Sequence, residues 1–187
     1  MTLDLGGCSD GELAALALAG RQSAYSELMR RHREPVYRLI RSHVGDADAA
    51  LDVTQQSFIA AFSALRRYDA ERPFRGWMAR IAINKARDWA RRRAVRRLFT
   101  FARPIEEAGE VADPGALADV RLADRHMLDE AMAAIARLPT KLKDVLILRT
   151  IEGLSQAESA SVLGISEKAV ETRLYRARSK LSEILRG

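Results

Sequence analysis

Apolar side chains recur every three or four residues along most of the chain, and no segment shows a sustained alternation of apolar and polar residues. The first spacing gathers apolar residues on one face of a helix, whereas a half-buried strand requires the second. Alanine, leucine, arginine and glutamate, all good helix formers, dominate the composition. The sequence therefore predicts an all-α fold.

The longest interruption of this pattern covers residues 98–118, which contain two prolines, two glycines and four acidic residues. Such a composition is typical of a flexible linker. We therefore expect two small helical domains, residues 10–97 and 119–187, joined by this acidic linker. A chain of 187 residues is long enough for two such domains.

Caps, glycines and prolines divide the two domains into expected helices. These helices cover residues 10–19, 22–33, 35–44, 46–66 and 74–97 in the first domain, and 140–151, 156–163 and 166–185 in the second, after a helix that ends at Pro139. Pro35 suits the first turn of a helix, so we expect separate helices on its two sides. Within residues 46–66, an apolar stripe at helical spacing is expected to face the core and consists of Leu51, Phe58, Phe62 and Leu65.

Positive charge is concentrated between residues 66 and 103, which carry 13 basic and 3 acidic side chains. Residues 104–140, in contrast, carry 3 basic and 8 acidic side chains. All but one of the basic residues in the first stretch are arginine, whose planar guanidinium binds phosphate groups and stacks on bases. This concentration favours a polyanionic partner over an ordinary solvated surface.

Several kinds of site are excluded by the residues that the sequence lacks. Cys8 is the only cysteine, so an intramolecular disulfide is impossible, and there is neither a CxxC pair nor a Cys/His cluster to hold zinc. The three histidines are scattered, so we expect no metal and no cofactor. No apolar run approaches the roughly 18 residues of a membrane span, and no secretory signal is visible. We expect a soluble, cytoplasmic protein without membrane insertion.

The C-terminal part of the chain has the pattern of a helix-turn-helix motif. Ser155 and Glu158 can form a capping box at the start of a short helix. Gly164 suits the tight turn that follows, and Ser166 can cap a longer second helix. On that helix, polar and basic side chains suited to base edges are Lys168, Glu171, Thr172, Arg173, Tyr175 and Arg176. The pattern predicts a helix that reads duplex DNA.

A second candidate surface lies on the expected helix 74–97. Four of its polar residues follow one another at intervals of four, three and four and therefore share one face, namely Arg80, Asn84, Arg87 and Arg91. Arginines in a row can follow a phosphate backbone, and an amide can read a base. Trp77 is more consistent with the core, whereas Tyr68 and Phe74, in or beside a loop, are candidates for stacking on bases. Basic grooves with aromatic side chains bind single-stranded DNA.

Together these motifs resemble those of the extracytoplasmic-function (group 4) RNA polymerase sigma factors of the sigma-70 family. The matching stretches, in the same order as in the family, are Gly45–Phe58, Arg72–Asn84, Arg87–Asp88, Arg91–Arg93, Leu138–Pro139, Glu152–Glu158, Leu163–Ser166 and Arg176–Leu181. Each motif alone is moderately specific, and their combination is highly specific.

The resemblance implies region 2 in the first domain and region 4 in the second, both of which dock on core RNA polymerase. It places the polymerase clamp contact at Asp52, Gln55 and Gln56. Recognition and melting of the minus-ten element falls on residues 67–97, with Tyr68, Phe74, Arg80, Asn84, Arg87 and Arg91 as candidate contacts. Minus-thirty-five recognition falls on the helix at 166–181. The resemblance also implies an anti-sigma factor that holds the chain inactive, and a role in a stress response.

Three positions depart from the common pattern of this family. Ser57 follows Gln56 where an acidic residue is frequent, and Ser159 stands where an aliphatic residue is usual. Glu171 lies on the reading helix, where it can accept a hydrogen bond from a cytosine amino group or pair with a nearby basic side chain.

Other classes of protein fit the sequence less well. A helix-turn-helix regulator that is not a polymerase subunit is the main alternative, but a two-component regulator needs an N-terminal βα receiver, which residues 1–97 do not show. A metal-sensing or ligand-binding repressor would need a ligand cluster, and His32, His43 and His126 form none. We do not expect an enzyme, because the sequence shows no nucleophile–base pair, carboxylate cluster or phosphate-binding loop.

Overall fold

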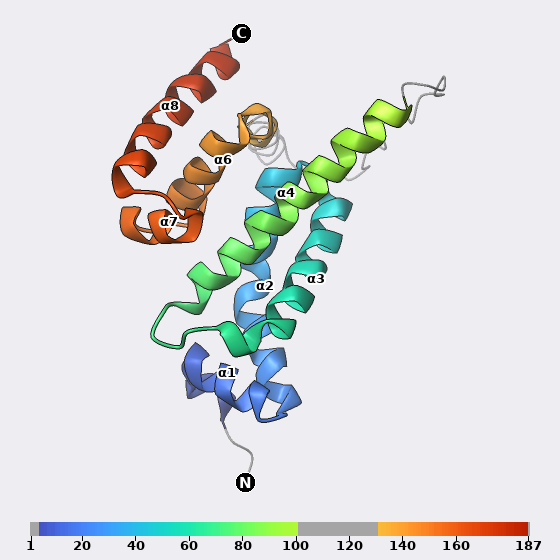
Figure 1. Cartoon of the computed structure of the whole chain (residues 1–187), viewed down its shortest axis with the longest axis vertical. Helices are drawn as coiled ribbons and strands as arrows, with labels where there is room; N and C mark the ends of the chain where they lie inside the picture. Colours follow the sequence, from blue (N-terminus) through green and yellow to red (C-terminus); the bar gives the residue numbers. More distant parts are fainter. Residues whose placement is uncertain (1–3, 101–130, 187) are drawn as a thin grey trace, which may run out of the picture.

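The computed structural model describes residues 4–100, with side chains through residue 96, and residues 131–186. The expected linker at 98–118 therefore lies almost wholly outside the described residues, as does the start of the second domain. Every regular element in the described part is helical, which confirms the all-α fold (Figure 1). No helix in these two ranges is long and apolar enough to cross a membrane.

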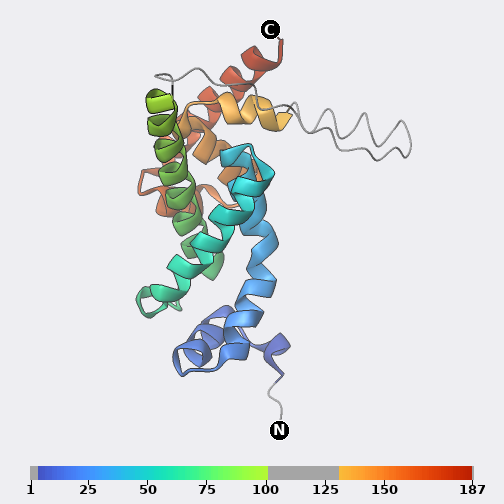
Figure 2. The same ribbon diagram turned by 90° about the vertical axis from the view of Figure 1, so that its right-hand side faces the viewer.

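The first domain is built around α2 (Gln22–Val44), on which α1 (Asp10–Leu18), α3 (Ala47–Ser63) and α4 (Phe74–Thr100) pack. Figure 2 shows α1 across one end of α2, with α3 and α4 along its length. Local sequence sets the helix ends: Ser9 and Glu12 form a capping box before α1, and the Asp46 carboxylate accepts from the Ala49 amide at 2.8 Å before α3. Gly45 ends α2 with a φ of 79°, a left-handed conformation that glycine adopts without strain.

The core of this domain is closed by large apolar side chains from all four helices. Those buried almost completely include Leu13, Leu28, Leu39, Ile40, Val53, Phe58, Phe74, Met78 and Ile83. Burial of such side chains is the main favourable contribution to folding, about 1.5–3 kcal/mol for each.

Residues 22–44 form one continuous helix, so the expectation of two helices separated at Pro35 is wrong. A proline inside a helix removes one hydrogen bond and costs roughly 3 kcal/mol. Here Leu28 lies before the proline and Val36 and Leu39 after it, and all three are buried. The helix therefore continues because the same apolar face packs against its neighbours on both sides of Pro35.

The core-facing stripe of α3 also differs from the expected one, because Leu51 is 47% exposed. The buried face of α3 consists mostly of smaller residues, namely Ala50, Val53, Thr54, Ser57, Phe58 and Ala61. Small side chains let α3 approach α2 and α4 closely. Leu51 lies about 100° around the helix from Ala50, so its side chain falls outside the buried face. Helical spacing alone could not distinguish a buried small residue from an exposed large one.

The second domain contains a helical segment at 131–137, α6 (Thr140–Leu146), a π turn at Ile147–Ile151, α7 (Gln156–Leu163) and α8 (Glu167–Arg186). Ser155 and Glu158 form the expected capping box at the start of α7. Gly164 makes the turn with a φ of 64°. Val170 and Ala177 of α8 are fully buried against the domain, so the helix-turn-helix geometry predicted from the sequence is present.

The two domains pack against each other. One cluster of buried apolar residues includes Met78 of α4 and Val36 of α2 together with Leu148 and Val162 of the second domain. α7 contacts α4, and the π turn contacts α2; both views show the second domain against the same side of α4 (Figures 1 and 2). Two domains joined by a linker were expected, but the buried boundary that they share was not predicted from the sequence.

Candidate nucleic-acid interface

The four polar residues on α4 lie on one side of the helix, and we call them the α4 face. Arg80, Asn84 and Arg91 are exposed, whereas Arg87 is partly buried. Arg91 forms an ion pair with Asp88 on the same helix, and Arg87 forms an ion pair with Asp144 of the second domain. Three members of this face are thus open to solvent, and the fourth is occupied by a carboxylate.

The loop that precedes α4 is held by aromatic packing and a backbone contact. The Tyr68 ring lies 5.2 Å from that of Phe74 and 5.3 Å from that of Trp77. Its hydroxyl donates to the Arg72 carbonyl at 2.7 Å. Burial raises the pKa of the Tyr68 hydroxyl.

A cleft of about 600 Å³ lies between this loop and α7. Arg72, Trp77 and Arg80 line it on the first domain, and Glu158 and Ser161 line it on the second. Its size is within the range of ligand pockets, and its wall in the first domain combines cationic and aromatic side chains.

Phe74 belongs to the core and not to this cleft. Its side chain is only 1% exposed, and its ring packs on His32, Tyr68 and Trp77. The expectation that Phe74 stacks on a base is therefore incompatible with its burial. The position next to a loop suggested an accessible ring, but as the first residue of α4 it points into the domain. Trp77 is half-buried and packs on the core, and it still reaches the cleft.

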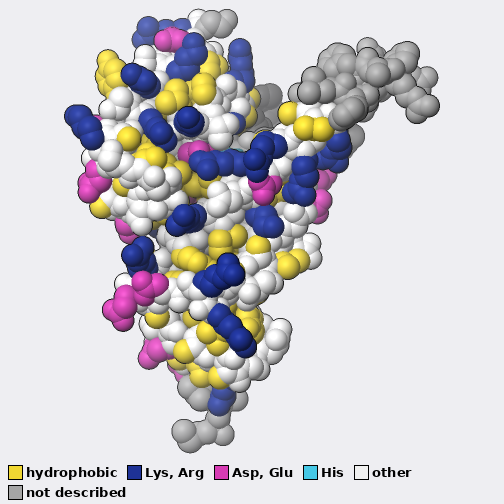
Figure 3. Space-filling model, in the orientation of Figure 1, with side chains coloured by type: hydrophobic (Ala, Val, Ile, Leu, Met, Phe, Trp, Pro, Cys, Tyr) yellow, Lys and Arg dark blue, Asp and Glu magenta, His cyan; other side chains and the backbone are white. Residues whose placement is uncertain are grey.

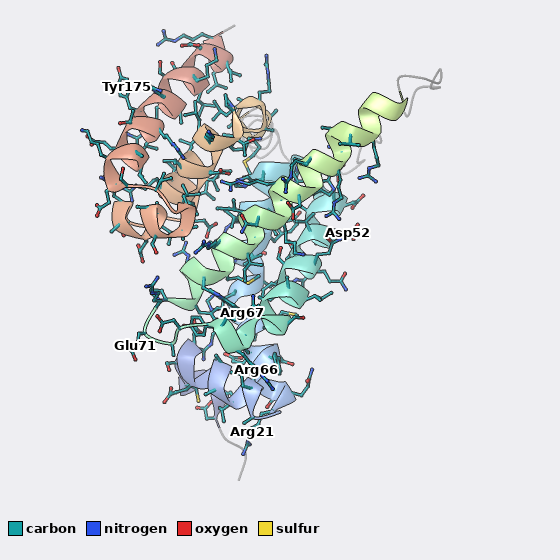
Figure 4. The ribbon with its side chains drawn as sticks, viewed as in Figure 1. Arg21, Asp52, Arg66, Arg67, Glu71 and Tyr175 are labelled. Carbon is teal, nitrogen blue, oxygen red and sulfur yellow. The ribbon has the colours of Figure 1, made fainter. Side chains whose placement is uncertain are left out.

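The reading residues of α8 form a second surface, which we call the α8 face. Its members are Lys168, Glu171, Thr172, Arg173, Tyr175 and Arg176, all exposed except the partly buried Arg173. Tyr175 is 77% exposed and lies on the outer side of α8 (Figure 4). Glu171 pairs with Lys168 at 2.9 Å, which is one of the two roles considered for it.

The third candidate surface, the α3 face, carries Asp52, Gln55 and Gln56, which are all exposed. Figure 4 places Asp52 on the side of α3 remote from α8. Two exposed apolar residues, Leu51 and Ile59 at 47% and 58%, lie four residues on either side of Gln55. Because residues four apart share a helix face, these apolar side chains flank the polar ones. Sequence reasoning missed Ile59 and assigned Leu51 to the core; the spacing 51, 55, 59 was the available signal.

Basic side chains outnumber acidic ones on the visible surface of both domains (Figure 3). Lys and Arg side chains are spread over both domains in the view of Figure 3, with fewer acidic ones between them.

No group of three or more potential metal ligands occurs in the part of the chain that the structure describes.

Two buried carboxylates at the domain boundary were not anticipated from the sequence. Asp144 of α6 is 1% exposed; it accepts a hydrogen bond from His43 Nε2 at 2.9 Å and pairs with Arg87. Glu152 is likewise buried and pairs with Arg75 at 3.1 Å. Burial lowers the pKa of the neighbouring Lys143, whose ammonium donates to the Ala136 carbonyl at 2.6 Å. Partners this distant in sequence leave no local signal.

Comparison with known proteins gives matches over both domains. Residues 28–96 match the family described as Sigma-70 region 2, and residues 128–181 match Sigma-70, region 4. The chain is 40% identical over 180 residues to RNA polymerase sigma factor CnrH of Cupriavidus metallidurans, which covers 95% of this chain and 94% of CnrH. It is 38% identical over 179 residues to RNA polymerase sigma factor NccH of Alcaligenes xylosoxydans xylosoxydans, with 95% of each chain covered.

A solved structure also resembles this one over nearly its whole length. It is described as the structure of CnrH in complex with the cytosolic domain of CnrY, and it matches with a TM-score of 0.69 and 37% sequence identity. The match covers 94% of this chain and 96% of that chain. The likeness thus includes both domains, in order.

Proposed function

This chain belongs to the extracytoplasmic-function group of the sigma-70 family of RNA polymerase sigma factors, and we propose that three separate faces divide its work at a promoter. As a member of this family it binds core RNA polymerase and directs promoter-specific initiation of transcription. In our proposal, the α3 face binds the polymerase clamp, the α4 face with its neighbouring cleft holds the opened minus-ten element, and the α8 face reads the minus-thirty-five element. The observation that carries this assignment is that α3, α4 and α8 each present a separate set of solvent-exposed side chains, with apolar residues beside the amides on α3 and arginines on α4 and α8.

The α3 face has the composition of a protein–protein contact. Apolar side chains at Leu51 and Ile59 can be desolvated in an interface, and Gln55 between them can supply hydrogen bonds. Interfaces concentrate their binding energy in a few such central side chains surrounded by polar ones. A surface for phosphates would instead be expected to carry arginine or lysine, and Asp52 has the wrong charge for one.

The α4 face suits a single strand taken out of the duplex. Removing a base from the stack costs a few kcal/mol, and stacking on an aromatic side chain returns roughly 1–3 kcal/mol. Tyr68 and Trp77 border the cleft and can provide that contact. Asn84 can hydrogen-bond a base edge, and the arginines can hold the phosphates of the displaced strand.

The α8 face suits duplex DNA, because a helix fits the major groove and its exposed side chains reach base edges. Arg176 can bind guanine through two hydrogen bonds, and Thr172 can contact either base type. The ion pair between Lys168 and Glu171 is exposed, so either side chain can exchange it for a contact with DNA at little cost.

A protein partner that holds the chain inactive is also part of the proposal. CnrH is solved in complex with the cytosolic domain of CnrY, and an anti-sigma factor of this chain would be expected to act in a comparable way. Release from such a partner under stress would then free the chain for core polymerase.

Run-off transcription with purified core polymerase tests the proposed function. A sigma factor confers specific initiation on core enzyme that is otherwise inert, whereas a helix-turn-helix regulator acting outside the polymerase cannot.

The assignment of the α3 face is tested with the variant Gln55→Ala/Ile59→Ser. This variant should keep its helicity and bind core polymerase more weakly by at least about 1 kcal/mol. Leu18→Ser, which changes an exposed apolar residue outside the α3 face, is the control. A folded double variant with unchanged core affinity would move the clamp contact elsewhere.

A further inference from the structure

Residues 5–11 precede α2 in the chain and are held on it by a single arginine. The Arg31 guanidinium donates to three backbone carbonyls of this segment, those of Leu5 at 2.9 Å, Gly6 at 2.9 Å and Cys8 at 2.7 Å. The match to Sigma-70 region 2 begins only at residue 28. The segment is therefore anchored to the first domain although it lies outside the family match, which assigns it no role.

Asp10, the first residue of α1, connects this anchor to the ring of His32. One of its carboxylate oxygens accepts from Arg31 at 3.3 Å, and the other lies 2.8 Å from His32 Nε2. Both side chains of the second contact are shielded from water, with 12% of His32 and 27% of Asp10 exposed. Hydrogen bonds are electrostatically stronger away from bulk water. The carboxylate therefore holds the His32 ring in one orientation.

The His32 ring in turn supports the aromatic group beside the cleft. It packs on Phe74, with the ring centroids 4.9 Å apart. Phe74 packs on Tyr68 at 5.2 Å and on Trp77 at 5.4 Å. Phe74 is buried, whereas Tyr68 and Trp77 line the cleft. The two rings proposed to stack on an opened strand thus rest on a buried ring that His32 backs.

α1 also lies against the loop at 68–73, which leads into α4 (Figures 1 and 2). A Cβ at Gly11 would lie 3.3 Å from Ala70 Cβ and 3.7 Å from the Ala70 carbonyl oxygen. Carbon atoms in favourable contact are about 3.5–4.0 Å apart, so glycine alone fits at position 11 without moving the loop. Burial first, and the charge of Asp10 second, raise the pKa of the Tyr68 hydroxyl. α1 therefore reaches the loop by contact and by charge.

The contacts inside the loop are of a different kind, because they join residues only two to four positions apart. Tyr68 donates to the Arg72 carbonyl at 2.7 Å, and the Asp69 carboxylate accepts from the Glu71 amide at 3.1 Å. Asp69 also pairs with Arg72 at 3.2 Å. Such local contacts set the shape of the loop. Its position relative to α4 depends on the more distant contacts with α1 and Phe74.

From these contacts, and resting on the function proposed above, we infer that Asp10, Gly11 and His32 are positioning residues for the cleft that receives an opened minus-ten strand. They do not touch DNA. Residues 5–11 and α1 support the loop at 68–73 from behind and keep Tyr68 and Trp77 where a base can stack. Support of this kind matters because a displacement of about 1 Å within a site can reduce its effect about a hundredfold.

The first test displaces the loop with Gly11→Ala in the full-length chain. The added methyl group requires Ala70 to give way by a few tenths of an ångström, and we expect promoter opening by holoenzyme to fall about threefold or more. Opening is measured by permanganate reactivity on a duplex promoter that supports run-off transcription. Gly11→Ala/Ala70→Gly removes the opposing methyl group and should open the promoter as well as Ala70→Gly alone. The matched control is Gly7→Ala, where a Cβ would meet nothing within 4 Å.

The second test removes the support of His32. Asp10→Ala should lower opening about fivefold to tenfold, with unchanged affinity for core polymerase. Asp10→Asn should restore most of it, because its amide oxygen can accept from Arg31 while its nitrogen donates to unprotonated His32 Nε2. Asp48→Ala is the matched control, assayed with saturating core polymerase. Asp48 is an exposed carboxylate in the first turn of α3, as Asp10 is in the first turn of α1, so both substitutions remove a favourable charge from a helix N-terminus.

Two measurements separate positioning from a general loss of structure. Gly11→Ala should not lower the urea midpoint of unfolding, because alanine favours a helix more than glycine does. Trp77 and Trp89 are the only tryptophans, so in a Trp89→Phe background the emission of Trp77 reports on the cleft. Gly11→Ala and Asp10→Ala should each shift this emission toward that of an exposed indole, and the two restoring substitutions should reverse the shift.

The outcomes distinguish this inference from the function on which it rests. Normal opening by either Gly11→Ala or Asp10→Ala would overturn the inference and leave the proposed function intact. Reduced opening that neither Ala70→Gly nor Asp10→Asn restores, or reduced opening with an unchanged Trp77 emission, would also overturn it. Failure of the original chain to confer promoter opening on core polymerase would instead contradict the proposed function.

Discussion

The α4 face and the α8 face use similar side chains but stand in opposite situations. Both combine arginine with a polar side chain that can read a base, and both lie on long helices. On α8 the reading residues are exposed, with Tyr175 at 77%. On α4, Arg87 is paired with a buried aspartate of the other domain. The comparison shows that two basic helix faces of similar composition differ in what covers them, which composition alone does not reveal.

The difference follows from how each helix is buried. α8 buries one face through Val170 and Ala177, so its opposite face points to solvent. α4 packs on α2 and α3 with one side and on α7 with another, so it contributes to the core of the first domain and to the boundary with the second. Only the remaining sector of α4 is left for a ligand.

The aromatic residues of the two helices should differ most clearly when truncated. Phe74→Ala removes a ring from the core and should cost about 3–5 kcal/mol of unfolding free energy. Tyr175→Ala removes an exposed ring and should cost less than about 0.5 kcal/mol. Urea unfolding of the full chain measures both. If Phe74→Ala left stability unchanged but impaired promoter opening, Phe74 would belong to the DNA surface after all.

Base reading by α8 can be separated from simple attraction to phosphates. Arg176→Ala should cost roughly 1–3 kcal/mol of binding at its preferred base and relax specificity at that position. Arg178→Ala, at another exposed arginine of α8, should lower binding to all sequences by a similar factor. Holoenzyme affinity for a set of minus-thirty-five variants measures both. If Arg176→Ala lowered the affinity for every sequence by the same factor, Arg176 would contact only phosphates.

A smaller effect concerns the packing of α7, the first helix of the helix-turn-helix motif. Ser159 is fully buried, and its hydroxyl has no hydrogen-bond partner among the described residues. An unsatisfied buried hydroxyl is costly, so Ser159→Ala should stabilise the chain by about 1 kcal/mol. Thermal unfolding measures the change, and promoter binding should stay the same because the residue does not reach the surface. A loss of stability would indicate a hydrogen bond of the Ser159 hydroxyl that the structure does not show.

Most of the fold could be predicted because its signals are local. The capping box at Ser155, the turn at Gly164 and the periodicity of α8 all act within a few residues, and each appears as expected. Three errors arose where tertiary packing overrides local preference: α2 continues through Pro35, Leu51 lies outside the core, and Phe74 lies inside it. The contacts of Asp144 with His43 and Arg87 join residues more than fifty positions apart, and no spacing rule reports such pairs. The exposed faces were therefore easier to predict than the boundary that covers one of them.

The most direct measurement compares promoter opening by two holoenzymes, one with the original chain and one with Asn84→Ala. Each is tested on a duplex promoter and on a promoter that is already mismatched at the minus-ten element. Permanganate reactivity should show less opening of the duplex by the variant, with a defect that depends on the base at one minus-ten position. The mismatched template should restore opening but not the base preference, and core binding should be unchanged. If Asn84→Ala opened every promoter variant normally, base reading by Asn84 would be contradicted. If substitutions of Arg80 and Arg87 also left promoter opening unchanged, the assignment of the α4 face to single-stranded DNA would be contradicted as well.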